Sequence, residues 1–115
     1  MKNNTENIIE KLNQIDWHDI PIEKIEFSTD KIVKFTVKAF LFNETKQNYD
    51  RITLEFIDII NLTTDQIVLS NKSDFEIYRF DYIKKENFEC ELILLSGFSK
   101  PSLTINLVCK KIYIK

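Results

Sequence analysis

The side chains best suited to chemistry lie in one short stretch, residues 15–22, with the sequence IDWHDIPI. It holds the only histidine and the only tryptophan of the chain, and two aspartates flank them. A histidine beside a carboxylate can bind a metal ion or act as a general base. His18 and Asp19 therefore raise the question whether this stretch is a reactive site or a connection between two elements.

A metal site would need more ligands than this stretch supplies. Zinc and transition-metal centres combine imidazoles with carboxylates or thiolates, and His18 has no second histidine to join it. Asp16, Asp19 and Glu23 could offer a site of carboxylates alone for Mg²⁺ or Ca²⁺, but their spacing matches no EF-hand loop. We therefore predict no metal and no cofactor.

Nucleophilic catalysis would require a thiol or hydroxyl group beside His18. Cys90 and Cys109, the only cysteines, each lie among alternating apolar residues, a pattern typical of buried thiols. A disulfide between neighbouring strands is the alternative. A hydrolase in which His18 works with Asp58 or Asp81 is a further alternative. The leading prediction contains no catalytic residue.

Composition narrows the class of protein. The chain has 115 residues, of which 43% are hydrophobic, and a formal net charge of -2. This length is typical of one domain, so we predict a single domain over residues 1–115. The small net charge and the presence of two arginines argue against nucleic-acid binding. Gly97 is the only glycine, which excludes a glycine-rich phosphate-binding loop.

No apolar run has the length of a membrane span. The first ten residues, MKNNTENIIE, also lack the apolar core of a signal peptide. We therefore expect a cytoplasmic protein with no membrane partner.

A predicted helix precedes the histidine. Pro21 cannot continue a helix and favours extended geometry at the residue before it, so residues 15–22 form a junction. Asn3 and Glu6 have the spacing of a capping box. An amphipathic helix over about residues 4–15 is predicted by four apolar side chains on one helical face, Ile8, Ile9, Leu12 and Ile15.

A β-rich region is predicted from about residue 20 to residue 115, because the apolar pattern there has a period of two. A polar connection is expected at residues 43–50 and a loop at residues 61–65. Short connections favour antiparallel pairing. We predict a mainly β (α+β) fold, in which the helix packs on an antiparallel sheet or small sandwich of six to seven strands.

Changes in the alternation predict irregular points in three strands. Bulges are expected at residues 23–24 and 110–111. Asp58 would point into the core, with a raised pKa, if its strand were regular. Alternatively, a bulge or strand end near Ile57 turns Asp58 outward, and Ile57 and Ile59 then take the inner face.

Aromatic residues supply the candidates for partner binding. Tyr78, Phe80 and Tyr82 share one parity of a strand, which predicts an aromatic face opposite an ion pair between Arg79 and Asp81. Aromatic anchors with a polar rim are typical of protein-binding sites. The partner-binding candidates are Trp17, His18, Asp19, Tyr78, Phe80 and Tyr82.

The C-terminal segment is locally basic. After Glu91 there is no acidic residue, and the lysines are Lys100, Lys110, Lys111 and Lys115. Lysines on a terminal strand commonly protect an edge from pairing with other chains. Docking of an anion or an acidic partner is the alternative.

The order of motifs resembles a group of small bacterial proteins. WHD at residues 17–19 precedes Ile22 and the sequence IEF at residues 25–27, and LEFIDI follows at residues 54–59. Over residues 16–60 these motifs resemble the "WHD-x-x-I-x-x-I-x-F" signature and the "L-x-F-x-D-(V/I)" strand of immunity protein 50 and YxiG-like proteins. The resemblance implies a β-rich cytosolic domain that binds and neutralises a protein toxin domain.

We therefore expect a non-enzymatic, cytosolic bacterial protein that acts by protein–protein binding, with toxin neutralisation as its specific form. The alternative from a different class is a small-molecule-binding β domain with an apolar cavity formed by its many Phe and Ile residues.

Overall fold

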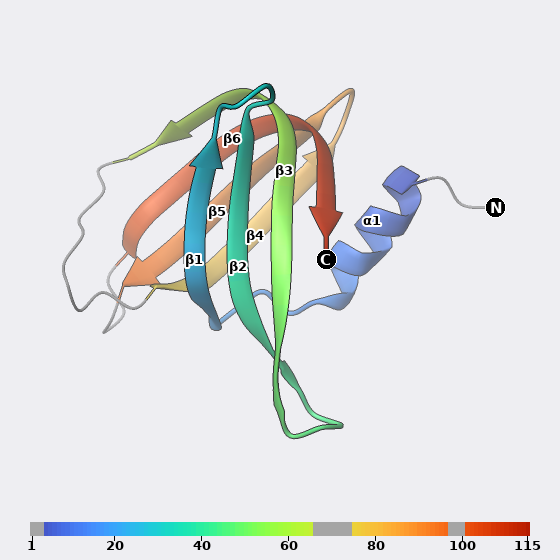
Figure 1. The fold of residues 1–115 in the computed structure, drawn as a ribbon, viewed down its shortest axis with the longest axis vertical. Helices are drawn as coiled ribbons and strands as arrows, with labels where there is room; N and C mark the ends of the chain where they lie inside the picture. The colour runs from blue at the N-terminus through green and yellow to red at the C-terminus, as the bar shows by residue number, and fades with distance from the viewer. Residues whose placement is uncertain (1–3, 66–74, 97–100) are drawn as a thin grey trace.

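The computed structural model describes residues 4–65, 75–96 and 101–115. It has one helix and six strands, which confirms the predicted mainly β fold with an N-terminal helix (Figure 1). The elements are α1 (Asn4–Gln14), β1 (Ile20–Ser28), β2 (Lys34–Asn43), β3 (Asn48–Thr64), β4 (Phe75–Lys84), β5 (Phe88–Ser96) and β6 (Pro101–Ile114).

The six strands form one closed antiparallel barrel in the order β1-β2-β3-β6-β5-β4. In Figure 1, β1 to β3 form the near wall, and β4, β5 and much of β6 form the far wall. Two residue pairs, Ile20 with Ile77 and Pro21 with Glu76, close the barrel between β1 and β4. The sequence predicted the antiparallel pairing, whereas closure depends on how far the strands twist and tilt. Closure pairs strands that an open sheet would leave at its edges.

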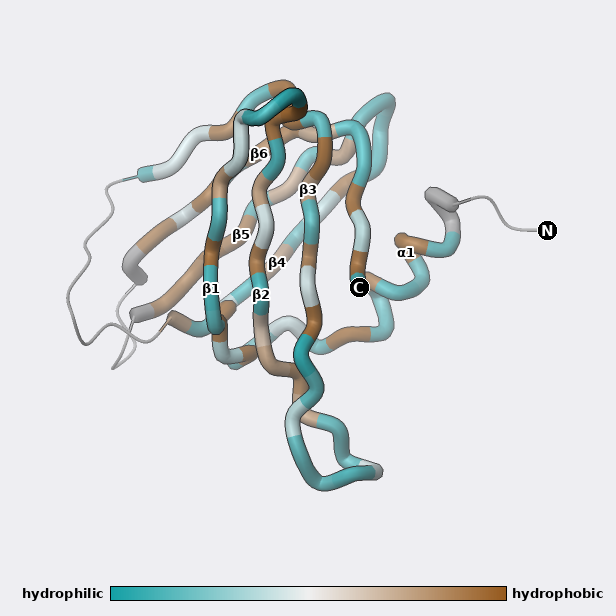
Figure 2. Tube along the Cα trace, in the orientation of Figure 1, coloured by the Kyte–Doolittle hydropathy of each residue, from teal (hydrophilic) through white to brown (hydrophobic). Residues whose placement is uncertain are grey.

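Strands β2 and β3 are longer than predicted. The expected polar connection at residues 43–50 is a turn at residues 44–47, because pairing continues to Asn43 opposite Asn48. The loop expected at residues 61–65 is also wrong, since β3 pairs with β6 as far as Thr64. Backbone pairing with a neighbouring strand thus continues both strands into polar sequence. The β2–β3 hairpin projects beyond the barrel (Figures 1 and 2).

The barrel interior is filled by apolar side chains from every strand. Figure 2 shows hydrophobic and hydrophilic residues alternating along the strands, as expected when one face of a sheet is buried. Burial of a large apolar side chain stabilises the fold by roughly 1.5–3 kcal/mol. The fully buried residues include Phe35, Phe56, Ile77, Leu92, Leu94 and Cys109.

Helix α1 packs at one end of the barrel beside the end of β6 (Figure 1). Ile8 and Leu12 are buried in the core, and Ile9 and Ile15 pack against it, which confirms the predicted apolar face. The helix ends at Gln14, one residue before the predicted limit. The predicted capping box of residues 3 and 6 lies outside the side chains that the structure describes.

The bulge predicted at residues 23–24 is confirmed. Ile22 pairs with Ala39 and Lys24 pairs with Lys38, so one extra residue of β1 lies between the two pairs. This bulge bends β1 as it passes from the closure with β4 to its long pairing with β2.

The predicted change of side near the end of β6 is also present, but the expected bulge at residues 110–111 is not. Cys109 and Ile112 are both buried, as are their neighbours across β3 at Phe56 and, in part, Ile59. In both strands, the side chains that face the core therefore change from one parity to the other across two residues. The register between the two strands does not shift at that point. The register shift between β3 and β6 lies instead between residues 59 and 61.

Asp58 lies at this turnover. It has a φ of 58°, in the left-handed region that aspartate tolerates better than most residues. Its side chain is half-buried, and the next residue, Ile59, packs against the core. This agrees with the alternative at Ile59, but that alternative is wrong at Ile57, which is half-buried and is not among the described residues that pack against the core.

Candidate functional site

The stretch at residues 15–22 forms the junction between α1 and β1. The backbone N–H of Asp19 donates to the carbonyl oxygen of Ile77 at 2.8 Å, and Asp19 has a φ of 64°. The backbone N–H of His18 donates to Asp16 Oδ1 at 3.1 Å. Aspartates favour such turns because their carboxylates accept nearby backbone hydrogen bonds. The turn therefore holds His18 and Asp19 beside the start of β4.

Trp17 and Phe80 belong to the core. They are 7% and 6% exposed, and their rings meet edge to face with centroids 5.2 Å apart. Trp17 Nε1–H donates to the carbonyl oxygen of Leu12 at 3.0 Å, which satisfies the buried indole and joins the junction to the helix. These two partner-binding candidates leave little surface for a partner and instead fix the position of their neighbours.

The single aromatic face predicted on β4 is wrong. The register between β4 and β5 shifts between Ile77 and Arg79, so Tyr78 occupies a bulge. Ile77 and Phe80 consequently both face the core, while Tyr78 faces outward. The sequence carried a signal for this bulge. In a regular strand, two residues three positions apart face opposite sides, so Ile77 and Phe80 could not both face the core without an inserted residue.

Tyr82 has an intermediate position. Its hydroxyl group donates a hydrogen bond to Asn13 Oδ1 of α1, and its ring lies against Phe80. Partial burial raises the pKa of Tyr82. Tyr82 therefore joins the helix to β4 and exposes only part of its surface.

The structure brings three of the candidates together at the surface, namely His18, Asp19 and Tyr78. The rings of His18 and Tyr78 have centroids 5.4 Å apart, and His18 Nδ1 lies 2.9 Å from Asp19 Oδ2. Tyr78 is 43% exposed, and the His18 and Asp19 side chains are more exposed still. His18 and Tyr78 border an open cleft of about 340 Å³ that is also lined by Asp16 and Arg79.

Arg79 extends this surface along β4 and β5. Its Nε lies 2.8 Å from Asp81 Oδ2, which confirms the predicted ion pair, and its Nη2 lies 3.0 Å from Glu91 Oε1. Glu91 was not among the predicted residues, because the pairing of β4 with β5 decides its place. The two carboxylates raise the pKa of Arg79, Glu91 most strongly.

Asp81 and Glu91 also line a second open cleft, of about 360 Å³, on the outer face of β3, β6, β5 and β4. Glu89 belongs to the same cleft. The two clefts thus adjoin through Arg79. We give the name junction surface to Asp19, which contacts His18, together with the cleft-lining residues Asp16, His18, Tyr78, Arg79, Asp81, Glu89 and Glu91.

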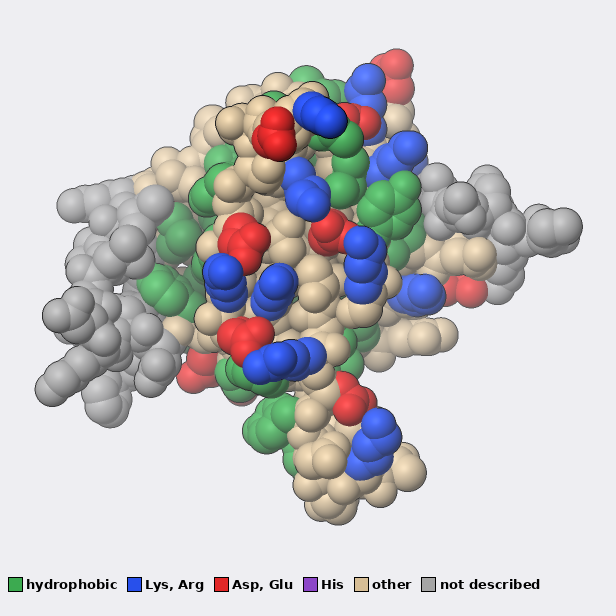
Figure 3. Space-filling view, in the orientation of Figure 1, with side chains coloured by type: hydrophobic (Ala, Val, Ile, Leu, Met, Phe, Trp, Pro, Cys, Tyr) green, Lys and Arg blue, Asp and Glu red, His purple; other side chains and the backbone are tan. Residues whose placement is uncertain are grey.

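The face formed by β1, β2 and β3 has a different charge arrangement. Lysine and glutamate side chains alternate across it (Figure 3). Glu55 is buried and lies between Lys115 at 2.8 Å and Lys34 at 3.2 Å. Lys115 and Lys34 lower the pKa of Glu55, Lys115 most strongly, although burial acts in the opposite direction. The charges on this face are thus largely neutralised within the molecule.

The cysteines are free, buried thiols on neighbouring strands, as the preferred prediction had them. Cys109 Sγ donates to the carbonyl oxygen of Lys111 at 3.5 Å. The contact with Cys109, together with burial, raises the pKa of Cys90, so this thiol stays protonated. Within the described ranges, no group of three or more His, Cys, Asp or Glu side chains could hold a metal ion.

Comparison with known proteins finds no family model, no curated protein and no solved structure that matches this chain. The class of protein is therefore defined by the structure alone, as a small closed antiparallel barrel with a helix packed at one end. Membership of the immunity protein 50 and YxiG-like group stays a prediction. In the part of the chain that the structure describes, no helix is long and apolar enough to cross a membrane.

Proposed function

We propose that the protein acts by binding another protein through the junction surface, without catalysing a reaction. The contact between His18 and Tyr78 carries this proposal. Both rings are exposed, yet the Asp19–Ile77 hydrogen bond and the β4 bulge hold them in place. An aromatic pair that is already ordered loses little conformational entropy when a partner covers it.

The charge of the junction surface favours a basic partner. Among the described residues, its carboxylates outnumber its cations: Asp81 and Glu91 share Arg79, Glu89 pairs with Lys85 at 3.4 Å, and Asp19 lies against His18 at 2.9 Å. A surface of this kind attracts clustered lysines and arginines and accelerates their association at low salt.

Toxin neutralisation in the bacterial cytosol is the specific form of this proposal. A toxin domain that cleaves nucleic acid needs clustered Lys and Arg to bind phosphates. An acidic surface with an aromatic centre could cover such a cluster and exclude the nucleic acid. The resemblance of residues 17–19 and 54–59 to motifs of immunity proteins supports the same proposal.

Co-expression with the proteins encoded next to this gene tests the proposal. We expect one of them to form a complex, and Tyr78→Ala to weaken its affinity about tenfold or more in calorimetric titration. Tyr49→Ala is the matched control, because Tyr49 is 58% exposed and lies on the projecting β2–β3 hairpin. The complex should also weaken as salt rises.

Two outcomes would contradict the proposal. One is that no neighbouring gene product binds. The other is that Tyr78→Ala and Tyr49→Ala bind a partner equally well, because the contact would then lie on another part of the molecule. Circular dichroism of each variant separates a loss of binding from a loss of folding.

A further inference from the structure

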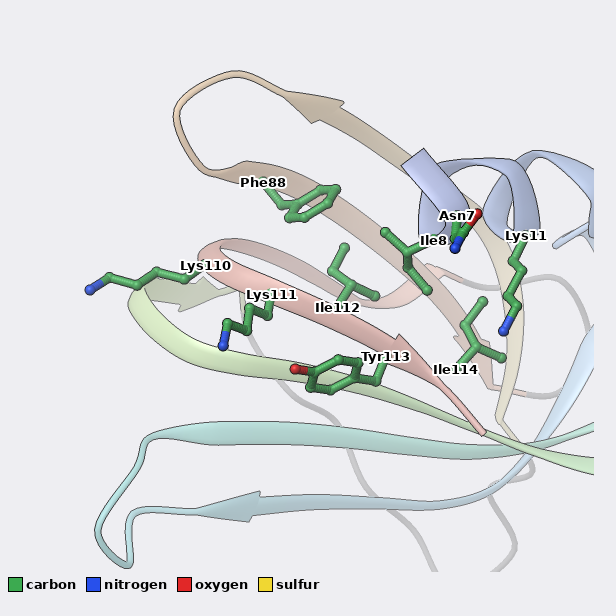
Figure 4. A pocket seen from close by; sticks show the side chains of 9 residues that line it. All are labelled: Asn7, Ile8, Lys11, Phe88, Lys110, Lys111, Ile112, Tyr113 and Ile114. Atoms are coloured by element: carbon green, nitrogen blue, oxygen red, sulfur yellow. The ribbon is translucent and has the colours of Figure 1, made fainter. Parts of the chain in front are cut away.

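One edge of β1 is paired only where the barrel closes. On its other edge, β1 pairs with β2 from Ile22 to Ser28. Among the described residues, the pairing of β1 with β4 is limited to Ile20 and Pro21. In Figure 1, β4 runs obliquely behind β1 and away from it beyond the point where the two strands meet. Figure 4, which looks into the cleft beside α1, shows β6, β3, β2 and β1 in turn, with β1 outermost.

The apolar interior of the barrel continues to this edge. Phe27 is the cross-strand neighbour of Phe35, and their rings stack with centroids 4.7 Å apart. Directly opposed side chains lie on the same face of a sheet, so Phe27 belongs to the inner face. Phe35 is fully buried, whereas Phe27 is 58% exposed. The core thus ends in an exposed aromatic ring, which a further strand beside β1 would cover.

The part of β1 that follows its bulge is a regular strand. The bulge lies between Ile22 and Lys24, and the ladder with β2 then runs from Lys24 to Ser28 without a shift. The outer edge of a regular strand presents backbone N–H and C=O groups, and these form a template for a strand of another chain. The occupant that fits this edge is therefore an extended strand.

The side chains of this edge are complementary to themselves. When two such edges pair antiparallel about Glu26, Ile25 of one copy lies opposite Phe27 of the other, and Lys24 lies opposite Ser28. Pairs of β-branched and aromatic side chains stabilise a sheet. We infer that β1 pairs with β1 of a second copy of this chain, in a twofold dimer whose sheet continues from one barrel into the other.

Register and charge both favour Glu26 as the centre. A register centred on Ile25 would bring the bulge to the interface, and one centred on Phe27 would run past the last residue of β1. The two Glu26 carboxylates would face each other, and such like-charge pairs are destabilising. However, Lys24 lies 2.8 Å and Lys38 3.9 Å from Glu26 within one chain. Each carboxylate thus brings two ammonium groups to the axis, which offset the repulsion.

Sedimentation equilibrium of the purified, full chain tests the inference. We expect a dimer that dissociates on dilution over roughly 1–100 µM, because a ladder of five residue pairs buries less surface than a standard interface. Phe27→Lys should raise the dissociation constant about tenfold or more, since it places a charge opposite Ile25. Ile83→Lys is the matched control, because Ile83 on β4 is also 58% exposed. It should leave the dissociation constant unchanged.

A cysteine at the centre of the ladder tests the register. Glu26→Cys should form a disulfide-linked dimer with diamide as the oxidant, because each residue 26 faces its own copy across the twofold axis. Glu44→Cys, in the exposed turn of the β2–β3 hairpin, should stay monomeric under the same treatment. The two native cysteines are buried, and the unaltered protein shows whether they contribute any cross-link.

Three outcomes would overturn the inference. They are a protein that stays monomeric at every concentration, an equal effect of Phe27→Lys and Ile83→Lys, and cross-linking of both cysteine variants or of neither. Circular dichroism identifies a lysine variant that does not fold, and the cross-linking result then decides. None of the altered residues belongs to the junction surface, so the outcome does not depend on the proposed protein partner.

Discussion

Neighbouring residues of the WHD motif have opposite environments. Trp17 is buried against Phe80, and His18 is exposed beside Tyr78. We predict that Trp17→Ala lowers the free energy of unfolding by about 3–5 kcal/mol, because it leaves a cavity in the core. His18→Ala should change it by less than about 0.5 kcal/mol.

Urea unfolding of both variants checks this prediction. A large loss of stability in His18→Ala would mean that its contacts with Asp19 and Tyr78 hold the junction together. In that case the histidine would have a structural role in addition to any contact with a partner.

Glu55 makes stability depend on pH. Its pKa is lowered in the folded protein, so its contribution is complete above the unfolded value of about 4.5. The contribution is lost as the pH falls through the lower, folded value. We expect Glu55→Gln to cost roughly 1–2 kcal/mol at pH 7, since the charged hydrogen bond from Lys34 and the ion pair with Lys115 are both weakened.

The measurement is thermal unfolding between pH 7 and pH 2. The unaltered protein and Glu55→Gln should converge in stability as the pH falls below about 4.5. Glu44→Gln is the control, because Glu44 is exposed in the β2–β3 turn and should show no such convergence. A difference that stays constant with pH would attribute the loss to packing instead.

At the level of the strands, the inward-facing side chains of β3 and β6 change parity at the place where Asp58 adopts a positive φ. Asp58→Val should lower stability by about 1–2 kcal/mol, because a β-branched residue is disfavoured in the left-handed region. Asp58→Gly should leave stability unchanged or raise it by up to about 1 kcal/mol. Chemical denaturation of both variants measures the difference between them.

Equal effects of valine and glycine at this position would show that the carboxylate itself, rather than the backbone conformation, matters there. The projecting β2–β3 hairpin follows the same general rule as this turnover. In both places the neighbouring strand decides where an element bends or ends, and local alternation does not reveal it.

At the scale of the whole molecule, the barrel is closed by its shortest ladder. Two residue pairs join β1 to β4, whereas β3 pairs with β6 along most of its length. We predict that the Asp19 amide, which bonds Ile77 across this seam, exchanges its hydrogen faster than the amides shared by β3 and β6.

Native-state hydrogen exchange measures this difference directly. Equal protection at the seam and in the long ladder would mean that the barrel opens only by global unfolding. Faster exchange at the seam would place the most easily opened part of the molecule directly beside His18 and Tyr78.

The candidate site could be predicted only in part. The sequence indicated that residues 15–22 form a junction and that Arg79 pairs with Asp81. It could not show that Tyr78 separates from Phe80, because one inserted residue reverses the facing of every side chain beyond it. Nor could it place Glu91 beside Arg79, since that contact requires the register of two strands.

The helix, the β-rich region and the antiparallel pairing could all be read from the sequence, because a period of 3.6 or 2 is a local property of the chain. Only the folded molecule shows that the sheet closes and that Tyr78 meets His18. Each of these depends on strand twist, bulges and register, which are set by neighbours distant in sequence.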